Sequence, residues 1–168
     1  MDVIILISVY LQLNNPCNDY NPPPRNDRLS RGTQLMFHRV LVANRRVAAC
    51  RVIRTLRRLG IASVAMLSDP DRHALHAAAA DQAVAIGGAT ASDSYLRIDR
   101  VLDAARATGA EAIHPGYGFL AENADFAQAC ADAGLVFIGS TPAQIRDFGQ
   151  AQAHPPLPKP TRPTAHSS

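Results

Sequence analysis

The stretch EAIHPGYGFLAEN, residues 111–123, places a histidine, a proline and two glycines between an apolar run and a helix-like run. Glycine allows a backbone to turn sharply or to approach a ligand closely. In open α/β sheets, the turn after a buried strand is also where ligands bind, and an anion there meets the N–H groups that begin the next helix. We therefore take this turn as the candidate binding site, with the candidate residues His114, Gly116, Tyr117, Gly118, Glu122 and Asn123.

The residues alone leave two explanations of this turn open. In the first, Gly116 and Gly118 bring the backbone close to a ligand, and Glu122 and Asn123 begin the next helix. In the second, the glycines make only a sharp strand-to-helix turn, and His114 is a packed histidine. Neither explanation predicts a catalytic side chain or a set of metal ligands.

The same turn matches a dinucleotide-binding fingerprint, because Gly116, Gly118 and Ala121 fit the pattern G-x-G-x-x-A. A true fingerprint follows the first strand, and an acidic residue near the end of the next strand binds the ribose. The next apolar run here ends in FIGST, without a carboxylate, and the turn after the first run has no glycine. The match is therefore weak, and NAD binding is not expected.

The elements that must position this turn alternate along the middle of the chain. Short apolar runs predict strands at 39–43, 62–67, 83–87, 111–114 and 135–139. Amphipathic segments between them predict helices, the first of which ends at Gly60. A later helix is expected over 95–108 with Ser92 or Ser94 as its N-cap.

The last predicted helix begins with the sequence TPAQ. Thr141 is its expected N-cap, Pro142 occupies the first helical position, and Gln144 completes a capping box. The whole alternation predicts an α/β fold: a Rossmann-like, mostly parallel sheet of about five strands, with helices on both faces. Ligands bind such sheets at the carboxyl ends of the strands, so the turn ANRRVAA, residues 43–49, is a second candidate.

Composition divides the chain into an extension over 1–35, a folded domain over 36–149 and a tail over 150–168. Both flanks are rich in proline and turn-forming residues, and we expect them to be disordered. The opening MDVIILISVYLQL has Asp2 where a signal peptide has basic residues and is too short to span a bilayer, which leaves only a cryptic membrane-associating segment as an alternative. No membrane partner is therefore predicted.

The cysteines and charges narrow the class further. Three distant cysteines predict free thiols in a reducing compartment, and hence a cytoplasmic protein: Cys17, Cys50 and Cys130. Four arginines cluster on the first helix: Arg51, Arg54, Arg57 and Arg58. No aromatic residues interleave with them and acidic residues offset the charge, so nucleic acid is not an expected partner. A solvated helix face or a protein interface explains the cluster.

Several segments together resemble the N-terminal domain of biotin carboxylases, which precedes the ATP-grasp domain of biotin-dependent carboxylases. The resemblance covers residues 36–149 and includes VLVANR, RTLRRLGIASVAMLSDPDR, ADQAVAIG, HPGYGFLAEN and GLVFIGSTPAQIRDFG, in the family's order and spacing. The segment HPGYGFLAEN is the most specific of these. Two phrases, RTLRRLGIASVA and TPAQIRDFG, are most similar to urea carboxylases, and acyl-CoA carboxylase alpha subunits are almost as similar.

The resemblance implies ATP-dependent carboxylation of biotin, in which bicarbonate is activated as carboxyphosphate and CO₂ passes to a ureido nitrogen. The parent family uses ATP, magnesium and biotin. Its HPGYGFL turn faces the active-site cleft, which would make residues 114–123 cleft-facing here. The first helix of bacterial relatives contributes to homodimer contacts, which implies a homodimer or carboxylase partner through Arg51, Arg54 and Arg58.

The chain also departs from the family's pattern. The family has Gly-Glu where this chain has Arg46 and Val47, and a serine at Ala121, whose loss would cost about 0.5–2 kcal/mol if it were an N-cap. Its only lysine, Lys159, is wrongly spaced to contact ATP phosphates, and Met36 resembles a natural start. We therefore expect a truncated carboxylase that is inactive alone and binds no cofactor tightly. A split subunit or a non-catalytic interaction module is the alternative, and the acceptor is not determined.

Overall fold

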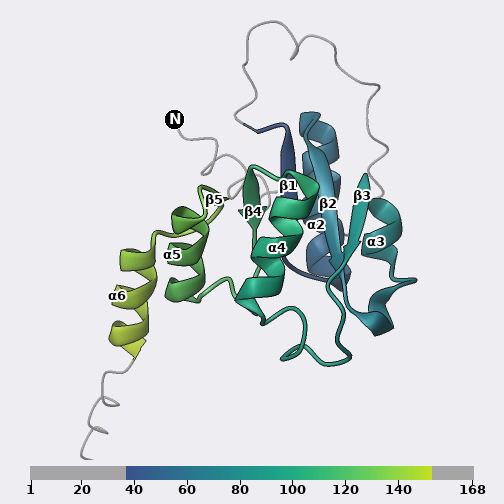
Figure 1. Ribbon diagram of the computed structural model, residues 1–168. Coiled ribbons are helices and arrows are strands. Elements are labelled where there is room, and N and C mark those ends of the chain that lie inside the picture. The colour runs from purple at the N-terminus through teal and green to yellow at the C-terminus, as the bar shows by residue number, and fades with distance from the viewer. Residues whose placement is uncertain (1–36, 153–168) are drawn as a thin grey trace, which may run out of the picture.

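Five parallel strands form one sheet in the order β3-β2-β1-β4-β5 (Figure 1). The computed structural model describes residues 37–152. Its strands are β1 (Arg39–Val42), β2 (Ala62–Leu67), β3 (Gln82–Ala85), β4 (Ala112–His114) and β5 (Val136–Phe137). The predicted α/β, Rossmann-like fold with a five-stranded parallel sheet is confirmed.

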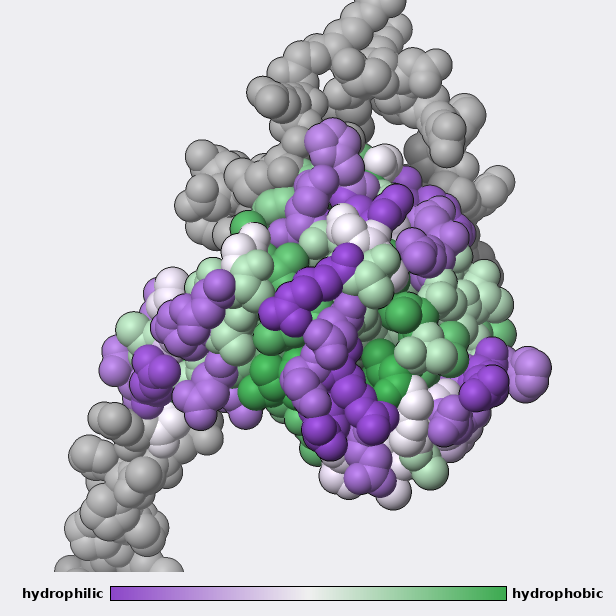
Figure 2. Space-filling view, in the orientation of Figure 1, coloured by the Kyte–Doolittle hydropathy of each residue, from purple (hydrophilic) through white to green (hydrophobic). Residues whose placement is uncertain are grey.

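Helices connect the strands and cover both faces of the sheet (Figure 1). They are α2 (Arg46–Leu59), the short 3₁₀ helix η2 (Asp69–Asp71), α3 (Leu75–Ala79), α4 (Ile98–Thr108), α5 (Ala124–Asp132) and α6 (Pro142–Gln152). Alternate β1 residues point to opposite faces, so Val40 and Val42 pack with α2 whereas Leu41 packs with α4 and α5. Helices α2, α4 and α5 bury their apolar stripes and expose the other side; over α4, Figure 2 shows a hydrophilic band.

Two helix ends follow the predicted chemistry. Gly60 ends α2 in the left-handed region at φ 75°. At the start of α6, the Thr141 N–H donates to Gln144 Oε1 at 2.9 Å, and the Gln144 N–H donates to Thr141 Oγ1 at 3.3 Å. The predicted capping box is therefore present, with Pro142 at the first helical position.

The predicted start of the helix expected over residues 95–108 is wrong. Helix α4 begins at Ile98, and its N-cap is Arg97, which makes no side-chain cap hydrogen bond. Neither serine caps it, because the Ser94 hydroxyl donates to the carbonyl of Thr90 and the Ser92 hydroxyl pairs with the Thr90 hydroxyl at 2.7 Å. Local hydrogen bonding within a turn has competed with capping.

Other boundaries shift by a few residues. Strand β3 ends before the predicted residue 87, because Gly87 and Gly88 adopt left-handed φ values of 64° and 80°. Helix α6 runs to Gln152, three residues past the predicted limit of the folded domain at 149. The predictions for residues 1–35, for Met36 and for residues 153–168 lie outside the described residues, so the domain limits stay predictions.

The described cysteines are free thiols. Cys130 is buried, and burial raises the pKa of its thiol to about 12, so it packs as a small apolar residue. Cys50 is half-buried, and Cys17 lies outside the described residues. Across residues 37–152, no helix is both long enough and apolar enough to cross a membrane.

Candidate functional site

The strand order changes direction at β1, which has β2 on one side and β4 on the other. In open parallel sheets, ligands bind in the crevice at the carboxyl ends of the two strands that flank such a switch point. Here that position is flanked by residues 43–47, which we call the β1 turn, and residues 115–119, which we call the β4 turn. The two turns are the two candidates from the sequence, and the sheet topology brings them together.

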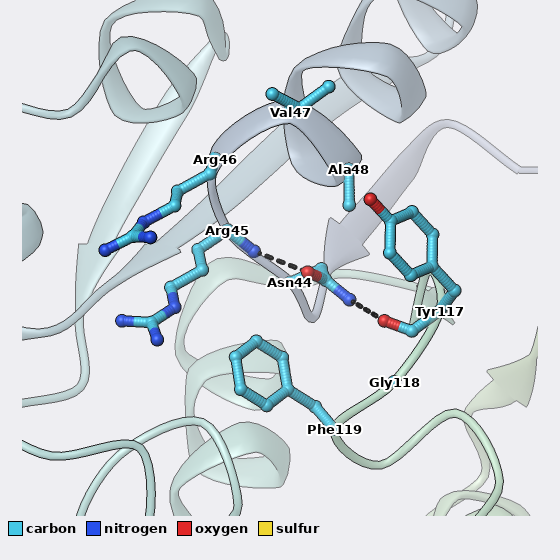
Figure 3. A pocket seen from close by; sticks show the side chains of 8 residues that line it. All are labelled: Asn44, Arg45, Arg46, Val47, Ala48, Tyr117, Gly118 and Phe119. Atoms are coloured by element: carbon cyan, nitrogen blue, oxygen red, sulfur yellow. Dashed lines mark hydrogen bonds between the residues drawn. The ribbon is translucent and has the colours of Figure 1, made fainter.

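The carboxamide of Asn44 joins the two turns (Figure 3). Its Nδ2 donates to the carbonyl of Pro115 at 2.8 Å and to that of Tyr117 at 2.9 Å. Its Oδ1 accepts the backbone N–H of Arg45 at 2.8 Å, and Asn44 is only 4% exposed. Both amide hydrogens are thus used within the protein. Asn44 lies in the second turn that the sequence suggested, but its role in joining the two turns was not predicted, although a polar side chain directly after a buried strand was a usable signal.

Gly116 is required by this connection. It adopts φ +70°, and a Cβ added there would lie 2.7 Å from Asn44 Nδ2. Both the left-handed backbone and the contact with Asn44 therefore exclude a side chain. The close approach that the sequence suggested at Gly116 is, in this structure, an approach to Asn44.

His114 lies beneath the β4 turn rather than on its surface. It is 7% exposed, and its Nδ1 accepts the backbone N–H of Gly116 at 3.0 Å. Burial lowers the pKa of His114 to about 4, so the ring is neutral at physiological pH with its proton on Nε2. The packed-histidine explanation describes its surroundings.

The remaining predicted residues divide into two groups. Tyr117 and Gly118 are exposed at the surface of the β4 turn, whereas Glu122 and Asn123 lead into α5. Asn123 is the N-cap of α5, and its side chain accepts the Phe126 N–H at 2.8 Å. The cost considered for losing a serine N-cap at Ala121 therefore does not apply, because the cap lies two residues later.

An open pocket of about 380 Å³ lies between the two turns. Its walls are residues 44–47 of the β1 turn, the next residue Ala48, and Tyr117, Gly118 and Phe119 of the β4 turn (Figure 3). Of the predicted site residues only Tyr117 and Gly118 line it. Val47, which is 67% exposed, and the Tyr117 ring give it a largely apolar wall. Within the part of the chain that the structure describes, no group of three or more His, Cys, Asp or Glu could hold a metal ion.

The Arg45 side chain joins three loops beside the pocket. Its guanidinium carbon lies 5.5 Å from the centre of the Tyr95 ring and 5.4 Å from that of Phe119, and Nη1 lies 3.7 Å from Asp71 Oδ2. The same Asp71 oxygen accepts hydrogen bonds from Ser68 and Tyr95, each at 2.8 Å. Burial acts to raise the pKa of Asp71, but these hydrogen bonds and the Arg45 charge hold it below the usual value.

Arg46 is strained where it begins α2. Its φ is 54°, in the left-handed region that glycine adopts easily and arginine does not. Its backbone N–H donates to the buried His76 Nδ1 at 3.4 Å, and the other His76 ring nitrogen lies 3.1 Å from the Met66 carbonyl. The related family has glycine at this position, and the φ value shows that the turn uses a conformation that glycine adopts without strain.

The arginine cluster predicted on the first helix does not line the pocket. Arg54 and Arg58 are exposed, Arg51 is half-buried, and Arg57 donates to the carbonyl of Ala79. They occupy the outer side of the helix, opposite the buried residues Ala49, Val52, Ile53 and Leu56.

Comparisons with known proteins agree on the family. A profile described as "Biotin carboxylase, N-terminal domain" matches residues 36–145. The methylcrotonoyl-CoA carboxylase subunit alpha of Oryza sativa subsp. japonica is 60% identical over 115 residues, which are 68% of this chain and 16% of that protein. The urea amidolyase of Saccharomyces cerevisiae is 50% identical over 114 residues, which are 68% of this chain and 6% of that protein.

Solved structures give the same result. The urea carboxylase of Kluyveromyces lactis has a TM-score of 0.67 and 50% identity, covering 67% of this chain and 10% of that one. The biotin carboxylase domain of a thermophilic 2-oxoglutarate carboxylase, bound to bicarbonate, has a TM-score of 0.65 and 49% identity, covering 68% and 26%. This chain thus spans a small part of the relatives it matches.

The strain at Arg46 predicts that Arg46→Gly stabilises the domain, raising the free energy of unfolding by about 1 kcal/mol because glycine adopts the observed φ without strain. Urea unfolding measures the change. Arg54→Gly, in the middle of α2, is the matched control and should lower the free energy of unfolding by about 1 kcal/mol. If Arg46→Gly and Arg54→Gly both lowered the free energy of unfolding, the backbone at Arg46 would not be strained.

The buried His114 predicts a pH-dependent stability. Its pKa is about 4 in the folded protein and about 6.5 when unfolded, so between these values the unfolded state binds more protons. The free energy of unfolding should therefore fall as pH drops from about 6.5 to 4, by up to about 3 kcal/mol from this group. Asn at position 114 keeps an acceptor for the Gly116 N–H but does not titrate.

Urea unfolding across this pH range should show a shallower slope for His114→Asn than for the wild type. The exposed His73 supplies the control, because His73→Asn should leave the slope as it is in the wild type. Equal slopes for His114→Asn and the wild type would show that His114 protonates without cost in the folded state.

Proposed function

This chain belongs to the biotin carboxylase N-terminal domain family, and from that premise we propose that it acts as the N-terminal domain of an ATP-dependent biotin carboxylase. The observation that carries the proposal is the family match over residues 36–145, which includes both turns of the pocket. Structures of one relative are described as bound to bicarbonate and to ADP. The proposed overall reaction is the bicarbonate- and ATP-dependent carboxylation of biotin.

In this proposal the β4 turn forms one wall of the active-site cleft. Tyr117 and Gly118 are the exposed residues that would face the cleft, and His114 and Gly116 hold the backbone beneath them. Glu122 and Asn123 serve the start of α5, where Asn123 already caps the helix. The domain would thus contribute shape and a rigid surface to the cleft rather than a reacting side chain.

ATP, magnesium and biotin belong to the proposed parent enzyme, and the pocket of this chain does not fit MgATP. Both amide hydrogens of Asn44 bind backbone carbonyls, and the Arg45 guanidinium is committed to Asp71 and two aromatic rings. The exposed Arg46 side chain also lines the pocket, but one flexible arginine would hold a phosphate only weakly. Phosphoryl groups need several cationic or N–H donors, and the 168 residues contain one lysine, Lys159. We therefore propose that this chain alone binds no cofactor tightly and is not catalytic.

A second candidate function is a non-catalytic interaction module or split subunit that docks onto a carboxylase partner. Several relatives are named as subunits or chains of carboxylases, which supports a carboxylase partner. The exposed Arg54 and Arg58 make the outer side of α2 available for a homodimer or a partner contact.

A cytoplasmic location also remains a proposal, since some relatives are named as mitochondrial.

The acceptor of the carboxyl group is not assigned by this domain. The relatives include methylcrotonoyl-CoA carboxylase subunits at 60% identity and a urea amidolyase at 50%, so the two phrases that resembled urea carboxylases do not decide between them. In the parent family the acceptor is bound by other domains, which leaves either acceptor compatible with the proposal.

Isothermal titration with MgATP should give no micromolar binding to the purified chain, because a single exposed arginine, Arg46, is the pocket's one cation outside the Arg45 contacts among the described residues, and one flexible arginine holds phosphate weakly. The chain alone should likewise release no phosphate from ATP in the presence of bicarbonate and biotin. When the chain is mixed with a relative that lacks its own N-terminal domain, bicarbonate-dependent phosphate release should appear.

Each arm of this experiment has a contradicting outcome. Micromolar MgATP binding or biotin-stimulated turnover by the chain alone would show that it contains a complete nucleotide site. No gain of phosphate release on mixing, despite a folded chain, would contradict its role as the N-terminal domain.

A further inference from the structure

We infer that Arg45 is a positioning residue whose side chain holds the β4 turn in place and so shapes the wall of the pocket. The inference rests on the proposed function only in assigning that wall to an active-site cleft. The contacts that carry it lie entirely within the described residues.

An arginine at this position needs an explanation. Arg45 is the N-cap of α2, where Ser, Thr, Asp and Asn are preferred because their side chains accept a hydrogen bond from the first turn. A guanidinium has no acceptor, and the N-cap of α2 makes no side-chain hydrogen bond. The first turn also holds no acidic residue. The side chain at position 45 therefore contributes nothing to the helix end, and its contacts lie elsewhere.

Those contacts join three segments that lie far apart in the sequence. Asp71 follows β2, Tyr95 precedes α4, and Phe119 belongs to the β4 turn. The Tyr95 and Phe119 rings are stacked, with centres 5.4 Å apart and planes 9° from parallel. The Arg45 guanidinium lies within 5.5 Å of both ring centres, a distance at which a cation is attracted to the aromatic face. Since the Arg45 side chain is only 28% exposed, water screens this attraction incompletely.

Phe119 is the contact that reaches the pocket. Its φ is 46°, a left-handed value that a phenylalanine holds only when its surroundings fix it. The ring is fixed by the stack with Tyr95 and by Arg45. Tyr117 and Gly118, the adjacent residues of the same turn, line the pocket. The β4 turn is therefore held at two points by consecutive residues: Asn44 binds its first half, and Arg45 holds its last residue.

Amide hydrogen exchange followed by NMR tests this inference on the whole chain, without nucleotide. Two amides that hydrogen-bond at the β4 turn are reporters: Gly116, which donates to His114 Nδ1, and Ala121, which follows the turn and donates to the Gly118 carbonyl at 2.9 Å. In Arg45→Asn they should exchange about tenfold faster than in the wild type, because local opening of the turn no longer breaks the Arg45 contacts. The Ile61 amide, bound to the Leu56 carbonyl at 3.0 Å, is the reference.

The choice of asparagine separates positioning from overall stability. Asparagine is a preferred N-cap, so the amides of α2 should be at least as protected in Arg45→Asn as in the wild type. Arg72→Asn is the matched control: Arg72 also pairs with an aspartate of the same loop, Asp69 at 3.0 Å, but this pair is exposed. It should leave the reporter amides unchanged. Arg45→Lys, which keeps the charge, should restore part of the protection.

Equal acceleration of the reporter and reference amides, or the same local effect in Arg72→Asn, would overturn the inference. If Arg45→Asn fails to fold, Phe119→Leu replaces it. Loss of that ring should move the Arg45 side-chain proton resonances downfield, away from ring-current-shifted positions, and unchanged resonances would overturn the inference. These experiments measure only whether Arg45 holds the β4 turn. They use no nucleotide, so their outcome is independent of the titration that tests the proposed function.

Discussion

The hydrogen bonds of one buried carboxamide determine the geometry of the site. Asn44 directly follows the central strand β1, and its side chain binds the backbone of the turn that follows β4. Parallel strands bring these two turns to the same edge of the sheet, but only a specific contact fixes the separation between them. Gly116 has no side chain because Asn44 occupies that space, and the pocket is the opening that remains beside this contact.

The same constraint limits what the site can do. The Asn44 amide donates to two backbone carbonyls, the Arg45 guanidinium contacts Asp71 and two rings, and His114 is neutral and buried. Apart from the exposed Arg46 side chain, these polar groups already have partners, so the site provides a rigid, largely apolar surface and little affinity for phosphate. This agrees with the proposed role as one wall of a cleft that other parts of a carboxylase complete. Arg46, at a left-handed position, adds strain to that wall.

The sheet and the helix ends were predictable because they follow from local patterns. Continuous apolar runs identified the buried parallel strands, Gly60 marked the end of α2, and the capping box at Thr141 marked the start of α6. Ser94 was wrongly expected to cap α4, because its hydroxyl had a nearer carbonyl partner at Thr90. Asn44 and Arg45 lie in the second turn that the sequence suggested, but their contacts were not predicted, for a different reason. Their roles depend on residues about 70 and 74 positions later, and only the folded sheet brings those residues into contact.

The free energy of unfolding of Asn44→Asp tests the central role of Asn44 most directly. Aspartate has the same shape and still accepts the Arg45 N–H, but it places oxygen in place of Nδ2, opposite the carbonyls of Pro115 and Tyr117. Two buried hydrogen bonds are then replaced by repulsion, and urea unfolding at neutral pH should show a loss of about 3 kcal/mol or more. A free energy of unfolding within about 0.5 kcal/mol of the wild type, the range of ordinary surface substitutions, would show that the two turns do not depend on this residue.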